Sequence, residues 1–298
     1  MPELPEVETT IRSLNSKVID RIFIDVWSDW KKTIKKPDCA GRPKDFEDFK
    51  KKIKGKKINK IWRRAKNIIF DLSGGYSLLA HQKMTGHLLI GNWKLEIGNW
   101  KPLNTGPLQD ASNSYIHLMF WLSGGPMLAL SDLRKFAKIE LWKTNELLSS
   151  KEFKDLGPEP LEKDFTFEKF KQILKNKKAG KIKQILMDQS VIAGIGNIYS
   201  NEAMWRAKIH PQKDIAELSE KELKLLYQSV RKVLLLGIKL GGESFSDYRQ
   251  PDGTKGCFDE ERRVYQREGE KCSRCKAKIK RIKFGGRSSF FCPICQKL

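Results

Sequence analysis

Four cysteines near the C-terminus have the residue type and spacing of a metal site. Cys272 and Cys275 form one C-x-x-C pair, Cys292 and Cys295 form another, and sixteen residues separate the two pairs. Four thiolates at this spacing suit a closed tetrahedral site, which leaves no open position for catalysis on the metal. We therefore predict one structural Zn(II) ion bound by these four residues.

The segment around these cysteines is strongly basic. From Lys271 to Leu298 there are nine Lys and Arg residues and no acidic residue. The sequence KIKRIKFGGRSSFF between the two pairs predicts a β-hairpin, with Arg287 at or just after its Gly-Gly turn. Such a hairpin can bring Arg287 to a phosphate group, and the alternative is a solvated basic surface.

Two segments of the N-terminal half resemble each other at a constant offset of 50 residues. They are IIFDLSGGYSLLAHQKM (68–84) and LMFWLSGGPMLALSDLR (118–134), and each predicts a strand, a Ser-Gly-Gly turn, a second strand and a loop. The offset places Met84 opposite Arg134. We expect two similar hairpins in one sandwich with exit loops on the same side, unless the match of two common turns is coincidental.

A helix is predicted directly after Pro5. Its buried face consists of apolar residues at steps of four, three and four: Val7, Ile11, Leu14 and Val18. A proline in the first turn and nearby glutamates suit the positive end of a helix dipole. Glu6 and Glu8 therefore have an ordinary structural explanation.

The pattern of residue types divides the chain into two parts. Segments rich in β-branched and aromatic residues predict strands from about 20 to 145, whereas the pattern beyond residue 164 is helical. The stretch 147–164 is polar and marked by glycine and proline, which favours a linker. The 298 residues carry a net charge of +22, so we expect a polyanionic partner, with nucleic acid ahead of an anionic membrane surface.

Neither a signal peptide nor a membrane-spanning run is visible in the sequence. The start is acidic and contains proline, and the cysteines outside the C-terminal pairs, Cys39 and Cys257, are single. Because that usage suits a reducing compartment, we expect a cytoplasmic protein.

Several short motifs occur in a fixed order along the chain. They are MPELPEVETT, RRAK (63–66), LGPEPL (156–161), AGIGNIYSNEAMW (193–205), KIHP (208–211) and the two cysteine pairs. Together they resemble the formamidopyrimidine-DNA glycosylase family, bacterial repair enzymes that remove oxidised purines. The resemblance runs from Pro2 to Lys297, with extra residues around 92–113.

This resemblance implies an α+β fold of two domains. The N-terminal domain is expected to be a β-sandwich with an N-terminal helix, and the C-terminal domain a helical helix–two-turn–helix domain that ends in a β-hairpin zinc finger. The implied segments are a catalytic domain (1–146), a linker (147–163), the helix–two-turn–helix region (164–240), a lesion-recognition lid loop (241–261) and the zinc finger (262–298).

The resemblance also implies catalytic roles. After removal of Met1, Pro2 would present a secondary terminal amine, and an amine with a pKa near ~8 is about one-tenth neutral at pH 7. In the family this proline is the nucleophile that forms an iminium intermediate with C1′ of a flipped-out nucleotide. The other implied catalytic residues are Glu3 as general acid/base, Lys66 as proton donor in β-elimination, and Arg287 as a phosphate clamp assigned to δ-elimination.

A second implied set contacts DNA. Met84, Arg134 and Phe136 match the family's trio that fills the void left by the flipped nucleotide, and apolar wedges help to offset the cost of unstacking. Asn197, which follows Gly-Ile-Gly at the start of a helix, matches a phosphate ligand. Further implied DNA contacts are His81, Lys178, Lys183 and Tyr265.

The resemblance implies a monomer that removes oxidised purines from damaged double-stranded DNA and then cleaves the resulting abasic site as a lyase. It also implies a bacterial cytoplasmic protein that associates with the nucleoid when it is on DNA. One alternative is an endonuclease VIII-like enzyme for oxidised pyrimidines; Arg134 and Phe136 favour the purine branch. The other is a non-catalytic zinc-containing DNA-binding protein. The sequence departs from the usual family pattern at Gln82, Lys83 and Ala137.

Overall fold

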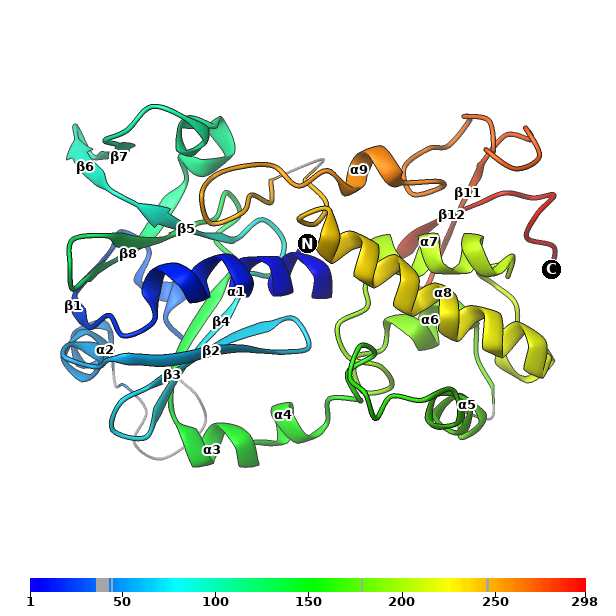
Figure 1. The fold of residues 1–298 in the computed structure, drawn as a ribbon, viewed down its shortest axis with the longest axis horizontal. Helices are drawn as coiled ribbons and strands as arrows, with labels where there is room; N and C mark the ends of the chain where they lie inside the picture. The colour runs from blue at the N-terminus through cyan, green and yellow to red at the C-terminus, as the bar shows by residue number, and fades with distance from the viewer. Residues whose placement is uncertain (36–42, 44, 178, 245–246) are drawn as a thin grey trace. The chain divides into compact units, whose positions relative to one another are not determined.

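The computed structural model describes residues 1–35, 43, 45–177, 179–244 and 247–298. The chain divides into two compact units (Figure 1). The first comprises Met1–Lys154 together with Leu240–Cys257, and the second comprises Asp155–Lys239 together with Phe258–Leu298. The segment Leu240–Cys257 therefore packs with the N-terminal unit, although it follows the long helix of the second unit in the chain.

Two four-stranded antiparallel sheets form most of the first unit. The first sheet contains β1 (Phe23–Ser28), β8 (Ile116–Leu122), β9 (Met127–Ser131) and β5 (His87–Gly91), in that order. The second contains β10 (Lys138–Lys143), β4 (Tyr76–His81), β3 (Asn67–Leu72) and β2 (Ile58–Arg64). Apolar side chains from both sheets share one buried core, which confirms the predicted sandwich.

The predicted N-terminal helix is α1 (Leu4–Val18). Its four expected core residues, Val7, Ile11, Leu14 and Val18, are all buried in the core of the sandwich. Helix α1 packs against β2, β3 and β5. Helix α2 (Phe46–Ile53) adds Phe49 and Ile53 to the same core.

The two similar hairpins are confirmed. Strands β3 and β4 pair in the second sheet around the turn at Ser73, and β8 and β9 pair in the first sheet around the turn at Ser123. The two hairpins therefore lie in different sheets of the sandwich.

The extra residues around 92–113 form a small hairpin and two short helices. These elements are β6 (Trp93–Glu96), β7 (Asn99–Pro102), η2 (Pro107–Gln109) and η3 (Ala111–Asn113). They cover aromatic side chains of the first sheet. The centre of the Trp100 ring lies 5.2 Å from the ring centre of Trp27 and 5.8 Å from that of Trp121. This segment therefore has its own apolar contact with the sandwich.

Short helices connect the two units. After β10, the chain forms α3 (Thr144–Ser149) and α4 (Lys151–Lys154), and Leu147 of α3 packs on Ile69, Leu79 and Trp142. The predicted linker at 147–163 thus begins with helical turns.

The second unit is helical and ends in a hairpin. Its main elements are α5 (Phe167–Lys175), α6 (Ile182–Met187), α7 (Asn197–Ala207), α8 (Glu220–Lys239), α9 (Phe258–Glu261), β11 (Lys280–Phe284) and β12 (Arg287–Phe291). The predicted α+β class is confirmed. None of the described helices is long and apolar enough to cross a membrane.

Helices α7 and α8 approach each other closely at Gly237. A Cβ atom at this position would lie 2.5 Å from the ring of Tyr199, a fully buried residue of α7. We expect Gly237→Ala to lower the free energy of unfolding of the second unit by about 1–3 kcal/mol, because the ring cannot move aside without disturbing the core. Denaturant unfolding measures the change.

The matched control is Lys224→Ala, which removes an exposed side chain from the same helix. It should leave the unfolding midpoint within experimental error. Equal stability of Gly237→Ala and the unaltered protein would contradict the close contact between Gly237 and Tyr199.

Candidate active site

The residues after Met1 are buried and held by a helix cap. Pro2 is buried, and Glu3, which is 2% exposed, is the N-cap residue of α1. The Glu3 N–H donates to Glu6 Oε2 at 2.7 Å, as half of a capping box in which Glu3 and Glu6 satisfy each other's backbone. The cap therefore fixes the backbone directly after Pro2.

Arg63 positions the turn that carries Lys66. Its Nε donates to Glu8 Oε2 of α1 at 3.1 Å, and its Nη1 donates to the Ala65 carbonyl at 3.1 Å. Ala65 has a left-handed φ of 54°, and Lys66 is 6% exposed. The sequence indicated Arg63 only as part of the RRAK motif, whereas the structure shows that it joins this turn to the N-terminal helix.

The segment Leu240–Cys257 lies against the first turns of α1. The Glu243 N–H donates to Glu6 Oε1 at 2.8 Å, and the Tyr248 hydroxyl donates to the Glu6 carbonyl at 3.0 Å. Gly242 has φ +84°, and a Cβ there would lie 2.9 Å from Glu6 Cγ. Because burial raises the pKa of Tyr248, its hydroxyl stays protonated and able to donate.

The structure brings the exit loops of the two similar hairpins together. Arg134 Nη1 lies 3.2 Å from Met84 Sδ, and the Arg134 guanidinium lies 4.7 Å from the centre of the Phe136 ring. Met84 and Phe136 are 43% and 50% exposed, so two apolar side chains and the guanidinium form one exposed group. The expected convergence of Met84 and Arg134 is confirmed.

A buried carboxylate holds these two loops. Asp132, which is 2% exposed, accepts hydrogen bonds from the Thr85 hydroxyl in one loop and from the Ala137 N–H in the other, the latter at 2.7 Å. The Arg134 N–H donates to the Thr85 hydroxyl at 3.0 Å. No local sequence pattern indicates this role for Asp132, since it depends on contact between loops about 50 residues apart.

Two of the departures from the family pattern lie at the base of these loops. Gln82 is 2% exposed, and neither amide atom of its side chain has a hydrogen-bond partner among the described residues. Ala137 is 1% exposed, and its Cβ would lie 3.0 Å from a Cβ added at Gly86. The side chains at both of these positions are therefore buried at the base of the loops.

His81 ends β4 and is held in a neutral form. Its Nδ1 accepts a hydrogen bond from the Lys83 N–H at 3.0 Å. Burial lowers the pKa of His81 to about 3, and the positive charges of Lys83, Lys138 and Lys66 act in the same direction. An uncharged ring with its proton on Nε2 can donate one hydrogen bond but cannot form an ion pair with a phosphate.

Three of the predicted DNA-binding or catalytic residues meet in one cavity of the second unit. Asn197, Tyr265 and Arg287 line a hollow of ≈ 400 Å³. Arg281 adds a second guanidinium to this lining, and Glu268 adds a carboxylate that lies 3.7 Å from Arg281. Asn197 opens α7 after Gly196, so the positive end of this helix adds to the cationic wall. The cavity has the charge and the N–H groups that favour a phosphate.

Glu202 and Lys183 form hydrogen bonds to backbone groups of residues that line this cavity. The Glu202 carboxylate accepts backbone N–H bonds from Arg263, Val264 and Tyr265 at 2.8–3.0 Å. Lys183 is 2% exposed and donates to the Ser288 carbonyl at 2.8 Å and to the Ser289 hydroxyl at 2.6 Å. Lys183 thus joins α6 to β12. Lys178, another predicted DNA contact, lies outside the described residues.

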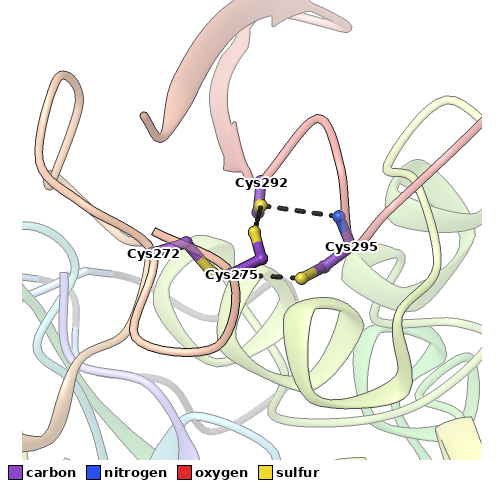
Figure 2. A group of neighbouring side chains, drawn as sticks. All are labelled: Cys272, Cys275, Cys292 and Cys295. Carbon is purple, nitrogen blue, oxygen red and sulfur yellow. Dashed lines mark hydrogen bonds between the residues drawn. The ribbon is translucent and has the colours of Figure 1, made fainter. Parts of the chain in front are cut away.

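The four predicted metal ligands converge (Figure 2). The thiol sulfurs of Cys272, Cys275, Cys292 and Cys295 all lie within 4.8 Å of one another. Tetrahedral Zn–S bonds of about 2.3 Å would separate the sulfurs by roughly 3.8 Å, so the group is suited to one zinc ion. Arg287 is exposed at the start of β12, directly after the Gly-Gly turn, as predicted.

Loss of one cysteine should release the metal and the hairpin. We expect Cys275→Ser to reduce bound zinc from one ion per chain to well below one, because three thiolates close the tetrahedron incompletely. Metal analysis and hydrogen exchange of residues 269–298 provide the readouts. Cys257→Ser, which alters an exposed cysteine outside the group, is the matched control. One tightly bound zinc ion in Cys275→Ser would contradict the assignment.

A titration of His81 tests its electrostatic environment. The unfolded chain binds a proton at this residue below about pH 6.5, whereas the folded protein resists protonation until about pH 3. The contribution of His81 to stability should therefore fall as the pH drops from about 6.5 towards 3, and His81→Gln should remove that part of the slope. NMR of the imidazole gives the pKa directly, and a value of 6.5 or above would contradict this environment.

Comparisons with known proteins agree with this arrangement. Residues 1–139 match the formamidopyrimidine-DNA glycosylase N-terminal domain, residues 156–249 its H2TH domain, and residues 269–298 the zinc finger found in FPG and IleRS. A formamidopyrimidine-DNA glycosylase of Pelotomaculum thermopropionicum is 39% identical over 100% of both chains.

Solved structures show the same similarity. The Lactococcus lactis Fpg in complex with DNA containing an abasic site has a TM-score of 0.84 at 35% identity, over 99% of this chain and 100% of that one. A MutM in complex with DNA containing carbocyclic 8-oxo-G has a TM-score of 0.83 at 36% identity, over 100% of both chains. The chain belongs to the formamidopyrimidine-DNA glycosylase family.

Proposed function

We propose that this protein is a bifunctional DNA glycosylase and abasic-site lyase that removes 8-oxoguanine and formamidopyrimidines from duplex DNA. The observation that carries the proposal is the buried turn Pro2–Glu3, which is held by a reciprocal cap and lies beside the segment Leu240–Cys257. Relatives seen in complex with DNA containing Fapy-dG, an abasic site or an 8-oxo-G analogue support this choice of substrate.

The proposed reaction starts at the amine of Pro2. Once Met1 is removed, its nitrogen attacks C1′ of the flipped-out nucleotide, and the bond from C1′ to the base breaks. The base leaves with that electron pair and takes up a proton. Opening of the sugar ring gives an iminium ion, for which Glu3 exchanges the protons. A secondary amine suits this step because its adduct is necessarily cationic.

The iminium ion then acts as an electron sink. Removal of a C2′ proton lets the 3′ phosphate leave by β-elimination, and a second elimination releases the 5′ phosphate. Lys66 supplies protons in the first elimination. Arg63 holds the turn that carries Lys66 against α1, because it bonds both to Glu8 and to the Ala65 carbonyl. Arg287 and the other cationic groups of the ≈ 400 Å³ cavity would bind phosphate.

The exposed trio of Met84, Arg134 and Phe136 would fill the space that the flipped nucleotide leaves. Two apolar side chains can enter the base stack, while the guanidinium hydrogen-bonds to the unpaired base opposite. The Asp132 carboxylate, which bonds to both loops, keeps the trio together during this insertion.

Borohydride trapping tests the nucleophile. With a duplex that contains 8-oxoguanine opposite cytosine, the unaltered protein should form a covalent complex and leave a one-nucleotide gap with phosphate at both ends. Pro2→Gly removes the secondary amine, so the trapped complex should fall at least about a hundredfold. Gel electrophoresis with labelled DNA measures both products.

Two controls accompany this test. Pro2→Gly should keep the circular dichroism spectrum and the DNA affinity of the unaltered protein, since α1 retains its cap at Glu3. A parallel assay with thymine glycol separates the purine branch from an endonuclease VIII-like preference. DNA binding without any trapped adduct in the unaltered protein would support the non-catalytic alternative. Retention of Met1 in active protein would instead rule out Pro2 as the nucleophile.

A further inference from the structure

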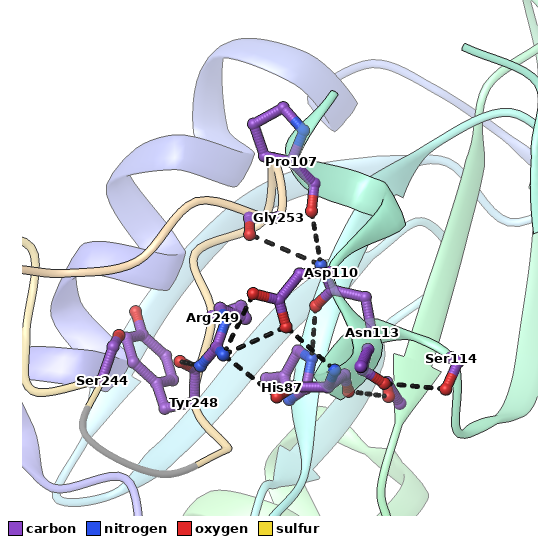
Figure 3. A network of polar contacts seen from close by, with 12 residues as sticks. His87, Pro107, Asp110, Asn113, Ser114, Ser244, Tyr248, Arg249 and Gly253 are labelled. Atoms are coloured by element: carbon purple, nitrogen blue, oxygen red, sulfur yellow. Dashed lines mark hydrogen bonds and ion pairs between the residues drawn. The ribbon is translucent and has the colours of Figure 1, made fainter. Parts of the chain in front are cut away.

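Arg249 carries a positive charge into the interior of the first unit (Figure 3). Its side chain is 5% exposed, and its Nη2 lies 3.0 Å from Asp110 Oδ1 and 3.2 Å from Asp110 Oδ2. It also donates to the Ser112 hydroxyl at 3.0 Å and to the Tyr248 carbonyl at 2.8 Å. A buried guanidinium is destabilising unless a counter-charge and hydrogen bonds compensate for the lost hydration, so these partners decide where Arg249 can lie.

Asp110 is held ready for this contact. It is the N-cap of η3, where its side chain accepts a hydrogen bond from the Ser112 N–H. Burial raises the pKa of its carboxyl, but the bonds from Ser112 and Arg249 outweigh burial and lower the pKa below its ordinary value. The carboxylate is therefore charged at neutral pH and keeps a fixed orientation.

A second set of contacts joins the same two segments. Asn113 Nδ2 donates to the Pro107 carbonyl at 2.9 Å and to the Gly253 carbonyl at 3.4 Å, and its Oδ1 lies 2.9 Å from His87 Nε2. The Ile90 N–H donates to the Pro251 carbonyl at 2.7 Å. The extra segment 92–113 and strand β5 thus form a seat for residues 249–253.

Only glycine fits at one point of this seat. Gly253 has φ +87°, and a Cβ atom there would lie 2.7 Å from backbone atoms of Pro107 and Leu108. So close an approach of two backbones, together with the buried guanidinium of Arg249, shows that residues 249–253 take a defined position rather than forming a loose surface loop.

The seat has a consequence for the first turn of α1. Tyr248 directly precedes Arg249, and its hydroxyl bonds to the Glu6 carbonyl. The Glu243 N–H bonds to the Glu6 carboxylate, which also caps the Glu3 N–H. A nucleotide whose C1′ lies at Pro2 would therefore have its base close to Leu240–Cys257. The contacts of residues 249–253 with the seat determine the position of that segment.

We propose that Arg249 and Asp110 are positioning residues for base excision: their ion pair fixes the segment beside Pro2 that faces the damaged base. This inference rests on the proposed function. An abasic site has no base to place, so the pair is needed for removal of the base and is dispensable for cleavage at a site that has already lost it. The two half-reactions of one enzyme therefore separate this role from general stability.

Three variants test the pair. Asp110→Asn keeps an oxygen that can cap η3 but removes the charge, Arg249→Leu removes the guanidinium, and the double variant removes both. Single-turnover rates are measured on two duplexes, one with 8-oxoguanine opposite cytosine and one with an abasic site opposite cytosine. Lys101→Met, which breaks an exposed ion pair with Glu96 in the same extra segment, is the matched control.

We expect each single variant to lower the rate of base excision by about tenfold while abasic-site cleavage stays within about twofold. The double variant should lose no more than the worse single variant, because the two residues act as one unit. Arg249→Lys should fall between Arg249→Leu and the unaltered protein, because an ammonium can pair with Asp110 but cannot reproduce the guanidinium fork. Lys101→Met should leave both rates unchanged.

Several outcomes would overturn the inference. They are an equal fall of both rates in Asp110→Asn, a fall in neither rate, or additive losses in the double variant. A melting temperature measured for each variant shows whether equal losses follow unfolding. If the unaltered protein excises no base although it cleaves abasic sites, the proposed glycosylase function fails and takes this inference with it. An unchanged ratio of the two rates in an active glycosylase overturns the inference alone.

Discussion

The carboxylate of Glu6 is the contact on which the candidate active site depends. One oxygen accepts the Glu3 N–H and closes the cap of α1, and the other accepts the Glu243 N–H from a segment 237 residues further along the chain. A carboxylate buried to 1% exposure is stable only when such donors replace water. The first turn of α1 and the segment Leu240–Cys257 are therefore held by the same carboxylate.

The loops that carry Met84 and Arg134 are also held by one buried carboxylate. Each loop leaves a hairpin of a different sheet, and the buried carboxylate of Asp132 bonds to both. Exposed apolar side chains are costly in a free protein, so a rigid support is required to keep them extended towards solvent. In the second unit, Glu202 plays a similar part for the backbone beside Tyr265.

Local patterns identified the elements and the metal site. The helical spacing of Val7 and Leu14, the Ser-Gly-Gly hairpins and the Gly-Gly turn before Arg287 each depend on residues a few positions apart, and the structure has all of them. The sequence did not identify Arg63 or Asp132 as supports. Each acts through one hydrogen bond to a distant segment, and an Arg or Asp in a highly charged chain carries no local signal of that role.

Residue types and their short-range spacing were enough to predict the main strands and helices, the four zinc ligands and, through the resemblance of the ordered motifs, the family. Those properties are written in short-range spacing and residue type. The packing of Leu240–Cys257 with the N-terminal unit and the contact between Arg249 and Asp110 could be seen only in the folded chain. Such pairings depend on which backbone segments pack together when the core forms. A buried charge is stable only beside a counter-charge, and packing determines which counter-charge is within reach.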